Sequence, residues 1–392
     1  MRLLYISPIH AGSYAQRPHF MVRALLEHGV ESALWVNPYP CRLLQWQDVL
    51  RASGLNDQGT PLDPRVRLLN VHALPIEPLP LGSRLNRLLL WRKAWREIER
   101  FAAAGPLILG IGRPCALALA ALRQLQPVAS FYDAMDNFPE FHHGLSRWAV
   151  RRHEDAVATK VDLIVASSTF LAEKFARRGL RVEKVANACE TNDQCRRQHD
   201  EGKIVCEPPI PQSSFITHNP PILGYLGCIA HWFDWPLVIR LAKTLPQMRI
   251  ELVGPCSAAP PETLPANVRL LPACQQSHAA GHLARFSAGL IPFRSSALTA
   301  GVDPIKYYEY RAAGLPVLST SFGEMALRGR GDGVYFLDRG DDWAAAVAAA
   351  LNHRCDAAEI ERFQHDNNWT SRFGQSVGFR SLWPASWIRR AA

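Results

Sequence analysis

Short apolar runs alternate with amphipathic stretches from the first residues of this chain to about residue 350. The runs are rich in Val, Ile and Leu, which is typical of buried strands, and the stretches between them carry apolar residues at helical spacing. Strands that alternate with helices build parallel sheets, because each helix carries the chain back to the same end of the sheet. The pattern therefore predicts an α/β fold.

The strands fall into two series, which predicts two doubly wound, Rossmann-like domains. Strands are predicted at residues 3–7, 32–36, 66–71, 107–111, 128–132, 162–167 and 182–185, and then at 222–226, 249–253, 268–271, 289–293 and 316–320. Prolines accumulate between the two series, so residues 191–221 are interpreted as a linker. We expect one domain at 1–190, a second at 222–361, and a helical tail at 362–392 that packs back on the body through its tryptophans.

The charge and cysteine content limit the partners and the compartment. A formal net charge of +9 favours anionic partners such as nucleotides, phosphorylated small molecules and acidic lipid headgroups. No zinc finger, aromatic RNA-binding signature or block of consecutive basic residues is present, so no nucleic acid is expected. The nine cysteines form no C-x-x-C pair and no run of eighteen apolar residues occurs, so we expect a cytoplasmic protein with reduced thiols.

Two glycines, Gly224 and Gly227, lie near the end of the first strand of the second series. Glycine there lets backbone amides approach a pyrophosphate at the start of the next helix, where the partial positive charge lies. A tight turn needs glycine at the same place for steric reasons alone. Both interpretations stay open on this pattern.

A denser cluster of charged residues lies further along the second series. Arg294 follows the strand predicted at 289–293, and Lys306 and Glu309 lie three residues apart near the start of a helix predicted at 304–313. A cation and a carboxylate in this arrangement suit a phosphate and a pair of ribose hydroxyls. The alternative is a surface ion pair that contributes less than about 1 kcal/mol.

The sequence D-P-x-K-x-x-E-Y-x-A-A-G-x-P-V at residues 303–317 resembles the donor-site signature of bacterial family-4-like (group 1) glycosyltransferases. G-Y-L-G at 224–227 with W-F-D at 232–234 resembles the phosphate-binding turn of their teichuronic-acid and exopolysaccharide transferase subgroup. The resemblance covers nearly the whole chain, including Y-D-A-M-D-N at 132–137. It implies a GT-B fold, two Rossmann-like domains facing a central cleft, with the nucleotide sugar bound mainly by the second domain and the acceptor by the first.

The same resemblance implies roles for individual residues. Glu309 would hold the ribose, and Lys306 and Arg294 would face the diphosphate. The other expected donor-binding residues are Gly224, Gly227, Asp303 and Tyr307. Since GT-B transferases generally neutralise the diphosphate with protein cations and helix dipoles, no metal and no cofactor is expected.

Two positions depart from the family pattern. Gly301 occupies the place of a second glutamate eight residues before Glu309, and the Arg and Lys usual after the glycine turn are replaced by H-W-F-D at 231–234. Retention or inversion at the anomeric carbon therefore stays open.

Two carboxylates follow the strand predicted at 128–132 in the first domain, at Asp133 and Asp136. A carboxylate at this edge suits removal of a proton from an acceptor hydroxyl. The other interpretation is that one of them caps the next helix or orders its loop. Asp136 is favoured as the catalytic residue because the family resemblance places an acid there. Gly12 and Arg17, in the loop after the first strand, are candidates for the acceptor side of the cleft by position.

Residues 81–101 predict a basic amphipathic helix. Its apolar face carries Leu88, Trp91, Trp95 and Ile98, beside Arg92, Lys93, Arg96 and Arg100. Such a helix docks on an anionic membrane surface or covers a sheet with a solvated basic flank. Both interpretations remain open.

The sequence thus predicts a glycosyltransferase of the hexosyltransferase type that acts on a saccharide or lipid-linked saccharide acceptor. The expected process is cell-surface polysaccharide biosynthesis, of exopolysaccharide or lipopolysaccharide, in the cytoplasm or on the inner face of the membrane. Two alternatives share the fold, a nucleotide-sugar epimerase and a catalytically silent subunit that binds a sugar nucleotide.

Overall fold

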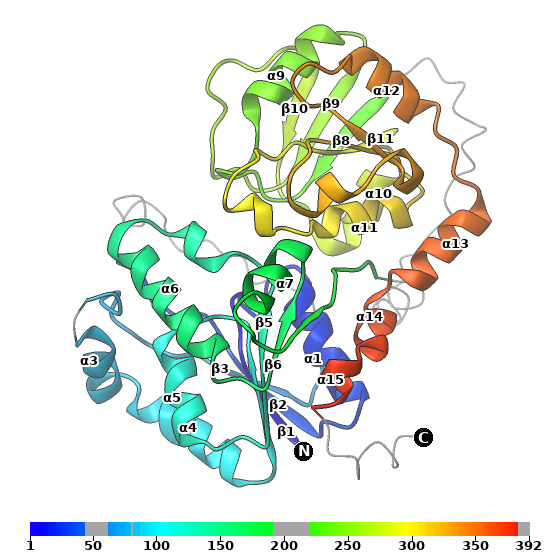
Figure 1. Ribbon diagram of the computed structural model, residues 1–392. Helices are drawn as coiled ribbons and strands as arrows, with labels where there is room; N and C mark the ends of the chain where they lie inside the picture. Colours follow the sequence, from blue (N-terminus) through cyan, green and yellow to red (C-terminus); the bar gives the residue numbers. More distant parts are fainter. Residues whose placement is uncertain (44–61, 80, 191–219, 383–392) are drawn as a thin grey trace. The chain divides into compact units, whose positions relative to one another are not determined.

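The computed structural model describes residues 1–43, 62–79, 81–190 and 220–382, and the chain divides into two compact units (Figure 1). Unit 1 joins Met1–Ala186 to the chain from Phe373 onward, and unit 2 comprises Asn187–Arg372. The expected linker falls almost wholly outside the described residues, as do Trp383 and Trp387 of the tail. Each unit holds one sheet in which every pairing is parallel, so the predicted α/β fold is confirmed.

The sheet of unit 1 has the order β3-β2-β1-β4-β5-β6-β7. Its strands are β1 (Arg2–Ile6), β2 (Ser32–Val36), β3 (Val66–Leu69), β4 (Leu107–Ile111), β5 (Ala129–Ala134), β6 (Leu163–Ala166) and β7 (Val182–Lys184). Its helices are α1 (Arg17–Glu27), α3 (Gly82–Leu89), α4 (Arg92–Ala103), α5 (Ala116–Gln124), η1 (Phe138–Phe141), α6 (Gly144–Ala158), α7 (Thr169–Ala176) and α15 (Val377–Arg380), and α14 (Trp369–Gln375) spans the boundary between the units.

The sheet of unit 2 has the order β10-β9-β8-β11-β12-β13. Its strands are β8 (Ile222–Leu226), β9 (Arg249–Val253), β10 (Val268–Leu271), β11 (Ala288–Ile291), β12 (Val317–Ser319) and β13 (Val334–Phe336). Its helices are α9 (Trp235–Thr244), α10 (Gln276–Leu283), η3 (Thr299–Gly301), α11 (Ile305–Ala312), η4 (Gly323–Leu327), η5 (Arg330–Asp332), α12 (Trp343–Leu351) and α13 (Ala357–Asp366). In both sheets the chain order reverses at one point, between β1 and β4 and between β8 and β11.

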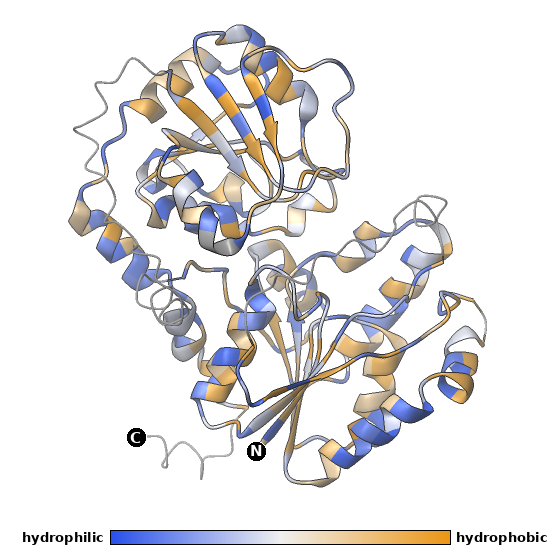
Figure 2. Cartoon of the chain, turned by 180° about the vertical axis from the view of Figure 1, so that it is seen from behind, coloured by the Kyte–Doolittle hydropathy of each residue, from blue (hydrophilic) through white to orange (hydrophobic). Residues whose placement is uncertain are grey.

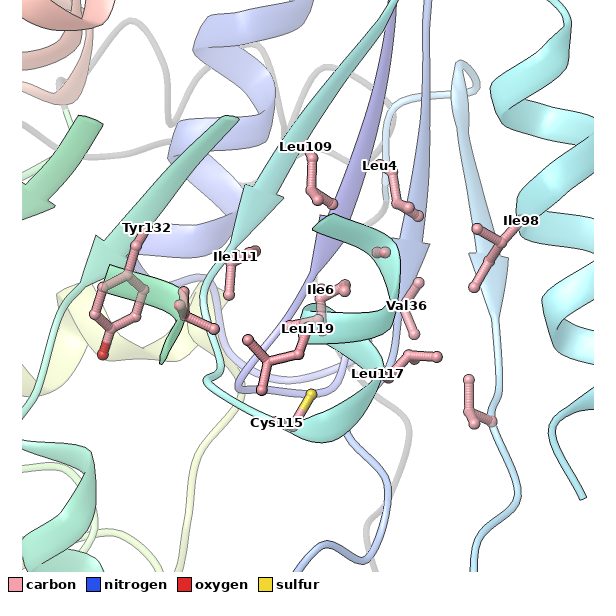
Figure 3. Packing of buried hydrophobic residues seen from close by; sticks show 14 of the residues in the cluster. Leu4, Ile6, Val36, Ile98, Leu109, Ile111, Cys115, Leu117, Leu119 and Tyr132 are labelled. Atoms are coloured by element: carbon pink, nitrogen blue, oxygen red, sulfur yellow. The ribbon is translucent and has the colours of Figure 1, made fainter. Parts of the chain in front are cut away.

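Apolar side chains from alternate strand positions form the main core of unit 1. Figure 3 shows this cluster, in which the strands β1, β2 and β4 meet the helices α4 and α5. Its labelled members are Leu4, Ile6, Val36, Ile98, Leu109, Ile111, Cys115, Leu117, Leu119 and Tyr132. Both the strands and the helices carry hydrophobic and hydrophilic stretches (Figure 2). The apolar runs of the strands are buried in this core, and such runs make the strand positions predictable from sequence.

The end of the described chain packs on the other face of the same sheet. Phe379 of α15 packs edge-on against Phe131 of β5, with ring centroids 5.5 Å apart, and lies 5.7 Å from Phe373. Glu183 accepts hydrogen bonds from Ser376 Oγ at 2.6 Å and from Phe379 N at 3.1 Å. Residues beyond position 372 therefore cover one face of a sheet formed by the first half of the chain.

Most strands lie within one or two residues of their predicted limits, and three differences change how residues are assigned. β5 runs to Ala134 rather than ending at residue 132, which places Asp133 inside the strand. β13 was not predicted, because its three residues give too short an apolar run. The helix predicted at 81–101 is two helices, α3 and α4, separated at Leu90 and Trp91.

Helix α3 begins at a residue with an unusual backbone. Leu81 has φ 62°, in the left-handed region, which costs a residue with a side chain about 1–2 kcal/mol. Gly82 follows, and a Cβ atom there would lie 1.8 Å from the carbonyl oxygen of Ile76, so only glycine fits. The side chain of Asn86 holds both backbone groups of Leu74, accepting from N at 2.8 Å and donating to O at 3.0 Å.

Among the helices described, none combines the length and the apolar character needed to cross a bilayer.

The packing of α15 predicts that its aromatic anchor supports unit 1. Phe379→Ala should lower the free energy of unfolding by about 3–5 kcal/mol, because it leaves a cavity against Phe131 and Phe373. Urea denaturation followed by tryptophan fluorescence measures the change. Phe170→Ala is the control, since Phe170 is 43% exposed, and it should cost less than about 1 kcal/mol. Equal losses in the two variants would contradict the packing role.

Candidate functional site

Ligands of open parallel sheets bind beyond the carboxyl ends of the strands, where the chain order reverses. In unit 2 this edge carries the loops after β8 and β11 and the start of α11. In unit 1 it carries the loops after β1, β4 and β5. The predicted site residues are distributed over these two edges.

Gly227 ends β8 in a conformation that only glycine adopts easily. Its φ is +145°, and a Cβ atom placed on it would lie 2.4 Å from Nζ of Lys306. Its own N–H donates to Val253 O at 2.8 Å, which ties the loop to the end of β9. The missing side chain therefore lets the ammonium of Lys306 lie against the loop backbone.

Lys306 and Glu309 lie half-buried on α11. Burial lowers the pKa of Lys306, and Glu309 opposes that shift; burial raises the pKa of Glu309, and Lys306 opposes it. The lysine ammonium lies 5.3 Å from the ring centroid of Tyr225. Within the described part of the chain, neither charged group makes a hydrogen bond or an ion pair. An ammonium and a carboxylate are thus desolvated at this edge with their hydrogen-bonding capacity unused.

Tyr310 fixes the position of α11 and was missed as a site residue. Its hydroxyl accepts a hydrogen bond from Leu226 N at 3.0 Å, and its ring fills the space left by Gly289, where a Cβ atom would lie 2.1 Å away. The helix is thereby joined to both β8 and β11. A glycine at the start of a predicted strand was the available signal, since it marks a close approach of another element.

Arg294 lies exposed after β11. Its backbone N–H donates to Trp232 O at 2.8 Å, so the loops after β11 and β8 are hydrogen-bonded to each other. The backbone of Arg294 is therefore held at the same edge as Lys306 and Gly227.

The remaining predicted donor residues have partners inside unit 2. Gly224 lies within β8, and a Cβ atom there would meet the ring of Phe286 at 2.2 Å. Tyr307 is 5% exposed, and its ring lies 4.0 Å from the guanidinium carbon of Arg328. Gly224 and Tyr307 therefore act in packing. The sequence pattern placed both residues near the site, but it did not indicate which side chains surround them.

Asp303 is buried, and both of its carboxylate oxygens are hydrogen-bonded. It accepts hydrogen bonds from Arg328 at 2.8 Å, from the hydroxyl of Tyr308 at 3.0 Å and from Asn187 N at 2.8 Å. These three bonds hold the start of α11, and the side chain is 0% exposed, so a sugar hydroxyl does not reach it. The carboxylate nearest to Gly301 in sequence is therefore structural.

In unit 1, Arg17 and Asp133 form an ion pair with both side chains 0% exposed. Arg17 Nε donates to Asp133 at 2.7 Å, and Nη1 donates to Val185 O at 2.7 Å. Tyr5 donates to the second carboxylate oxygen at 3.3 Å. Burial raises the pKa of Asp133, and Arg17 opposes that shift. Arg17 begins α1 and joins it to β5 and to the residue after β7. Because both side chains are 0% exposed, neither member of this pair is open to a ligand.

Asp136 differs from Asp133 in having no such partner. Burial and the charge of Asp133 raise the pKa of Asp136 to about 7, and Arg17 opposes the shift. The side chain is partly exposed, and its carboxylate makes no hydrogen bond within the described residues. A carboxyl group with this pKa can accept or release a proton near neutral pH.

The residue after Asp136 is held by a buried network. Lys174 donates to Asn137 Oδ1 at 3.0 Å and to Glu154 at 2.6 Å. Glu154 also accepts from the hydroxyl of Tyr132 at 3.0 Å. The loop that carries Asp136 is thus fixed to β5, α6 and α7.

Gly12 lies half-buried in the turn after β1. The preceding residue is held on both sides, since Ala11 N donates to Asn37 at 2.9 Å and His19 Nε2 donates to Ala11 O at 2.9 Å. Gly12 thus lies at the same edge as Asp136.

One cluster in unit 2 has metal-ligand chemistry, formed by His353, Cys355 and Glu359. The guanidinium of Arg311 lies among the three, 3.4 Å from His353 Nε2, 3.4 Å from Cys355 Sγ and 2.7 Å from Glu359. This arginine already supplies the positive charge there. These three side chains therefore bind the guanidinium of Arg311, and the cluster does not fit a metal ion.

The comparisons with known proteins give the fold. No protein-family model matches the chain, and no curated protein matches it by sequence. A sucrose-phosphate synthase from Thermosynechococcus elongatus superposes with a TM-score of 0.64 at 15% identity, over 97% of this chain and 98% of that one. Anabaena HepE in complex with UDP and glucose gives 0.59 at 13% identity, over 97% and 99%. A trehalose-phosphate synthase (UDP-forming) from Burkholderia xenovorans gives 0.58 at 12% identity, over 97% and 99%.

These neighbours are GT-B glycosyltransferases, and each is matched over nearly its whole length. The chain therefore has the GT-B fold that its sequence resemblance implied.

The raised pKa of Asp136 predicts a pH-dependent cost in stability. An unfolded aspartate has a pKa of about 3.9, so the native state binds this proton more tightly and loses stability as the pH rises from about 4 to about 7. Asp136→Asn removes that cost. Its gain in unfolding free energy should be larger at pH 8 than at pH 5 by about 1–2 kcal/mol, after allowance for solvent at the carboxylate.

Chemical denaturation at the two pH values measures this difference. Asp155→Asn is the matched control, because the Asp155 side chain is 48% exposed and its partner Arg178 is charged at both pH values, so its effect should be the same at both. A gain for Asp136→Asn that does not change with pH would show that Asp136 is ionised normally.

Proposed function

We propose that this chain is a glycosyltransferase that moves a sugar from a nucleotide-sugar donor to an acceptor hydroxyl. The observation that carries the proposal is the desolvated ammonium of Lys306, which lies against Gly227 at the carboxyl edge of unit 2 without a hydrogen-bond partner among the described residues. A diphosphate supplies the acceptors that such a cation lacks. The GT-B fold and the UDP bound by Anabaena HepE support the same assignment.

Unit 2 is proposed to bind the donor. Lys306 and Arg294 face the diphosphate, the loop at Gly227 lets it approach the backbone, and Glu309 accepts hydrogen bonds from the ribose hydroxyls. Cations and backbone amides neutralise the leaving diphosphate, so this proposal routes no step through a metal.

Unit 1 is proposed to bind the acceptor and to supply the base. Asp136 takes the proton of the acceptor hydroxyl as its oxygen bonds to the anomeric carbon of the sugar. The bond from that carbon to the diphosphate oxygen breaks, and the nucleoside diphosphate leaves with the electron pair. Asp133 and Arg17 act as positioning residues, since their ion pair holds β5 beside α1. The proposed acceptor is a saccharide or a lipid-linked saccharide of a cell-surface polysaccharide.

A catalytically silent sugar-nucleotide-binding subunit is the second candidate. Gly301 replaces an acid of the family pattern, and Asp303 cannot substitute because Arg328, Tyr308 and Asn187 occupy its carboxylate. Such a subunit would bind the donor and release no nucleotide from it.

The donor site predicts charge-specific losses of binding. Lys306→Met and Glu309→Gln keep the approximate size of each side chain and remove its charge. Each should weaken binding of the preferred nucleotide sugar at least tenfold, about 1.4 kcal/mol, in titration calorimetry against UDP-, GDP-, ADP- and dTDP-sugars. The controls are Lys243→Met and Glu262→Gln, which remove the charges of an exposed ion pair of 2.9 Å. Unchanged affinity in both test variants would place the donor elsewhere.

The proposed base predicts a loss of turnover without a loss of binding. Asp136→Asn should lower acceptor-dependent nucleotide release by about 10²–10⁴-fold and leave donor affinity unchanged. Wild-type release should fall as the pH drops below about 7, because the carboxyl group becomes protonated. Membrane lipid extract serves as the acceptor source, and Asp155→Asn is the control.

Three results would contradict the transferase. Release without acceptor that yields an isomeric nucleotide sugar would indicate an epimerase. Binding with no release from any donor and acceptor pair would indicate the silent subunit. Full activity in Asp136→Asn would show that another group takes the proton.

A further inference from the structure

Helix α3 has the reverse of the usual orientation of a surface helix. Amphipathic helices of globular proteins turn their apolar face to the core and their polar face to water. In α3 the buried residues are Gly82 and Asn86. Its leucines are exposed, with 61% for Leu81, 45% for Leu85, 57% for Leu88 and 66% for Leu89.

Leu85, Leu88 and Leu89 lie on one side of the helix. Their spacings of three and one residue place them within about 100° of the helical circumference, which is one continuous apolar stripe, and Leu81 immediately precedes the helix. We call this stripe the leucine face. The adjoining side of the helix is anchored by the hydrogen bonds of Asn86 to Leu74 and by the close approach of Gly82 to Ile76. The protein thus fixes the helix through its polar side and presents the leucine face outward.

Exposed basic side chains flank the leucine face. Arg84 lies on its edge in α3, and α4, which contacts α3, carries Arg92, Lys93 and Arg96 at exposed positions. Arg87 lies on another side of α3, where it donates a hydrogen bond to Gln124 at 2.9 Å. Two acids lie among them on α4. Glu97 accepts from Arg67 at 3.0 Å and Glu99 accepts from Trp95 at 2.7 Å, so both carboxylates are engaged. The surface therefore combines an apolar stripe with an excess of positive charge.

We propose that the leucine face and its basic flank form a docking surface for an anionic phospholipid bilayer. Leucines that enter the boundary of the acyl chains and arginines that contact lipid phosphates are the two elements of an interfacial helix. The surface differs from the one the sequence suggested, because Trp91 and Ile98 are buried at 1% and 0% exposure and belong to the core. This inference goes beyond the proposed transfer reaction and does not depend on it.

Charge favours a bilayer over a second copy of the chain. A symmetric dimer formed through this surface would bring two basic flanks together, in a chain whose formal net charge is +9. An anionic bilayer accepts the leucines and neutralises the flank at the same time. The left-handed conformation of Leu81 is consistent with this role, since a leucine at 61% exposure gives the isolated chain no packing that offsets the strain.

Vesicle co-sedimentation of the full chain tests the surface. Wild-type protein should bind vesicles of 70% phosphatidylcholine and 30% phosphatidylglycerol at least tenfold more strongly than pure phosphatidylcholine vesicles. Leu85→Ser with Leu88→Ser should lower the partition coefficient on anionic vesicles at least tenfold. Arg84→Gln with Arg92→Gln should lower it by a similar factor and weaken its dependence on salt.

Leu327→Ser is the matched control, because Leu327 is also 66% exposed and lies in unit 2. It should leave vesicle binding unchanged, and thermal denaturation should show that every variant is folded. Wild-type protein that does not bind anionic vesicles would overturn the proposal. So would a leucine variant that keeps full vesicle binding, or one that converts a dimer to a monomer in light scattering without any effect on vesicles.

Discussion

A charge that leaves water must be compensated, and this requirement organises both sheet edges. In unit 1 the buried carboxylate of Asp133 is compensated by Arg17, and in unit 2 that of Asp303 is compensated by Arg328. Each pair joins segments far apart in sequence and holds the start of a helix, α1 or α11. Breaking one partner of such a pair leaves an uncompensated buried charge, which is strongly destabilising. The edges of the sheets depend on these two pairs.

The same requirement distinguishes functional groups from structural ones. Asp136, Lys306 and Glu309 are desolvated, yet within the described residues they make no hydrogen bond. Their pKa values are shifted in the direction that burial imposes, toward the neutral form. Desolvated groups without partners reduce the stability of the free protein, and a bound ligand that supplies partners removes that cost. This is the physical basis for assigning the donor to Lys306 and Glu309 and proton transfer to Asp136.

The fold was predictable because it follows from local patterns, whereas part of the site depends on contacts that a sequence does not reveal. Apolar runs marked the strands, and the motif around Lys306 and Glu309 marked α11. The end of β5 was misplaced because a polar residue enters a strand when a partner compensates it, and Arg17 lies 116 residues from Asp133. Gly224 and Gly227 read alike in sequence, but only Gly227 lies beside a charged group. The catalytic assignment of Asp136 stays a prediction.

Helix α3 shows the limit of helical periodicity as a guide to burial. The pattern at residues 81–101 specified an apolar face without specifying what covers it. Because the helix is interrupted at Leu90 and Trp91, α3 and α4 do not turn the same side to the core. Helix α4 buries its apolar side, whereas α3 exposes its leucines. The direction of α3 is set by its small and polar residues, since only Gly82 permits the close approach to Ile76 and Asn86 satisfies both backbone groups of Leu74. A helix anchored through its polar side keeps its apolar side available, and that orientation is determined by hydrogen bonding rather than by hydrophobic burial.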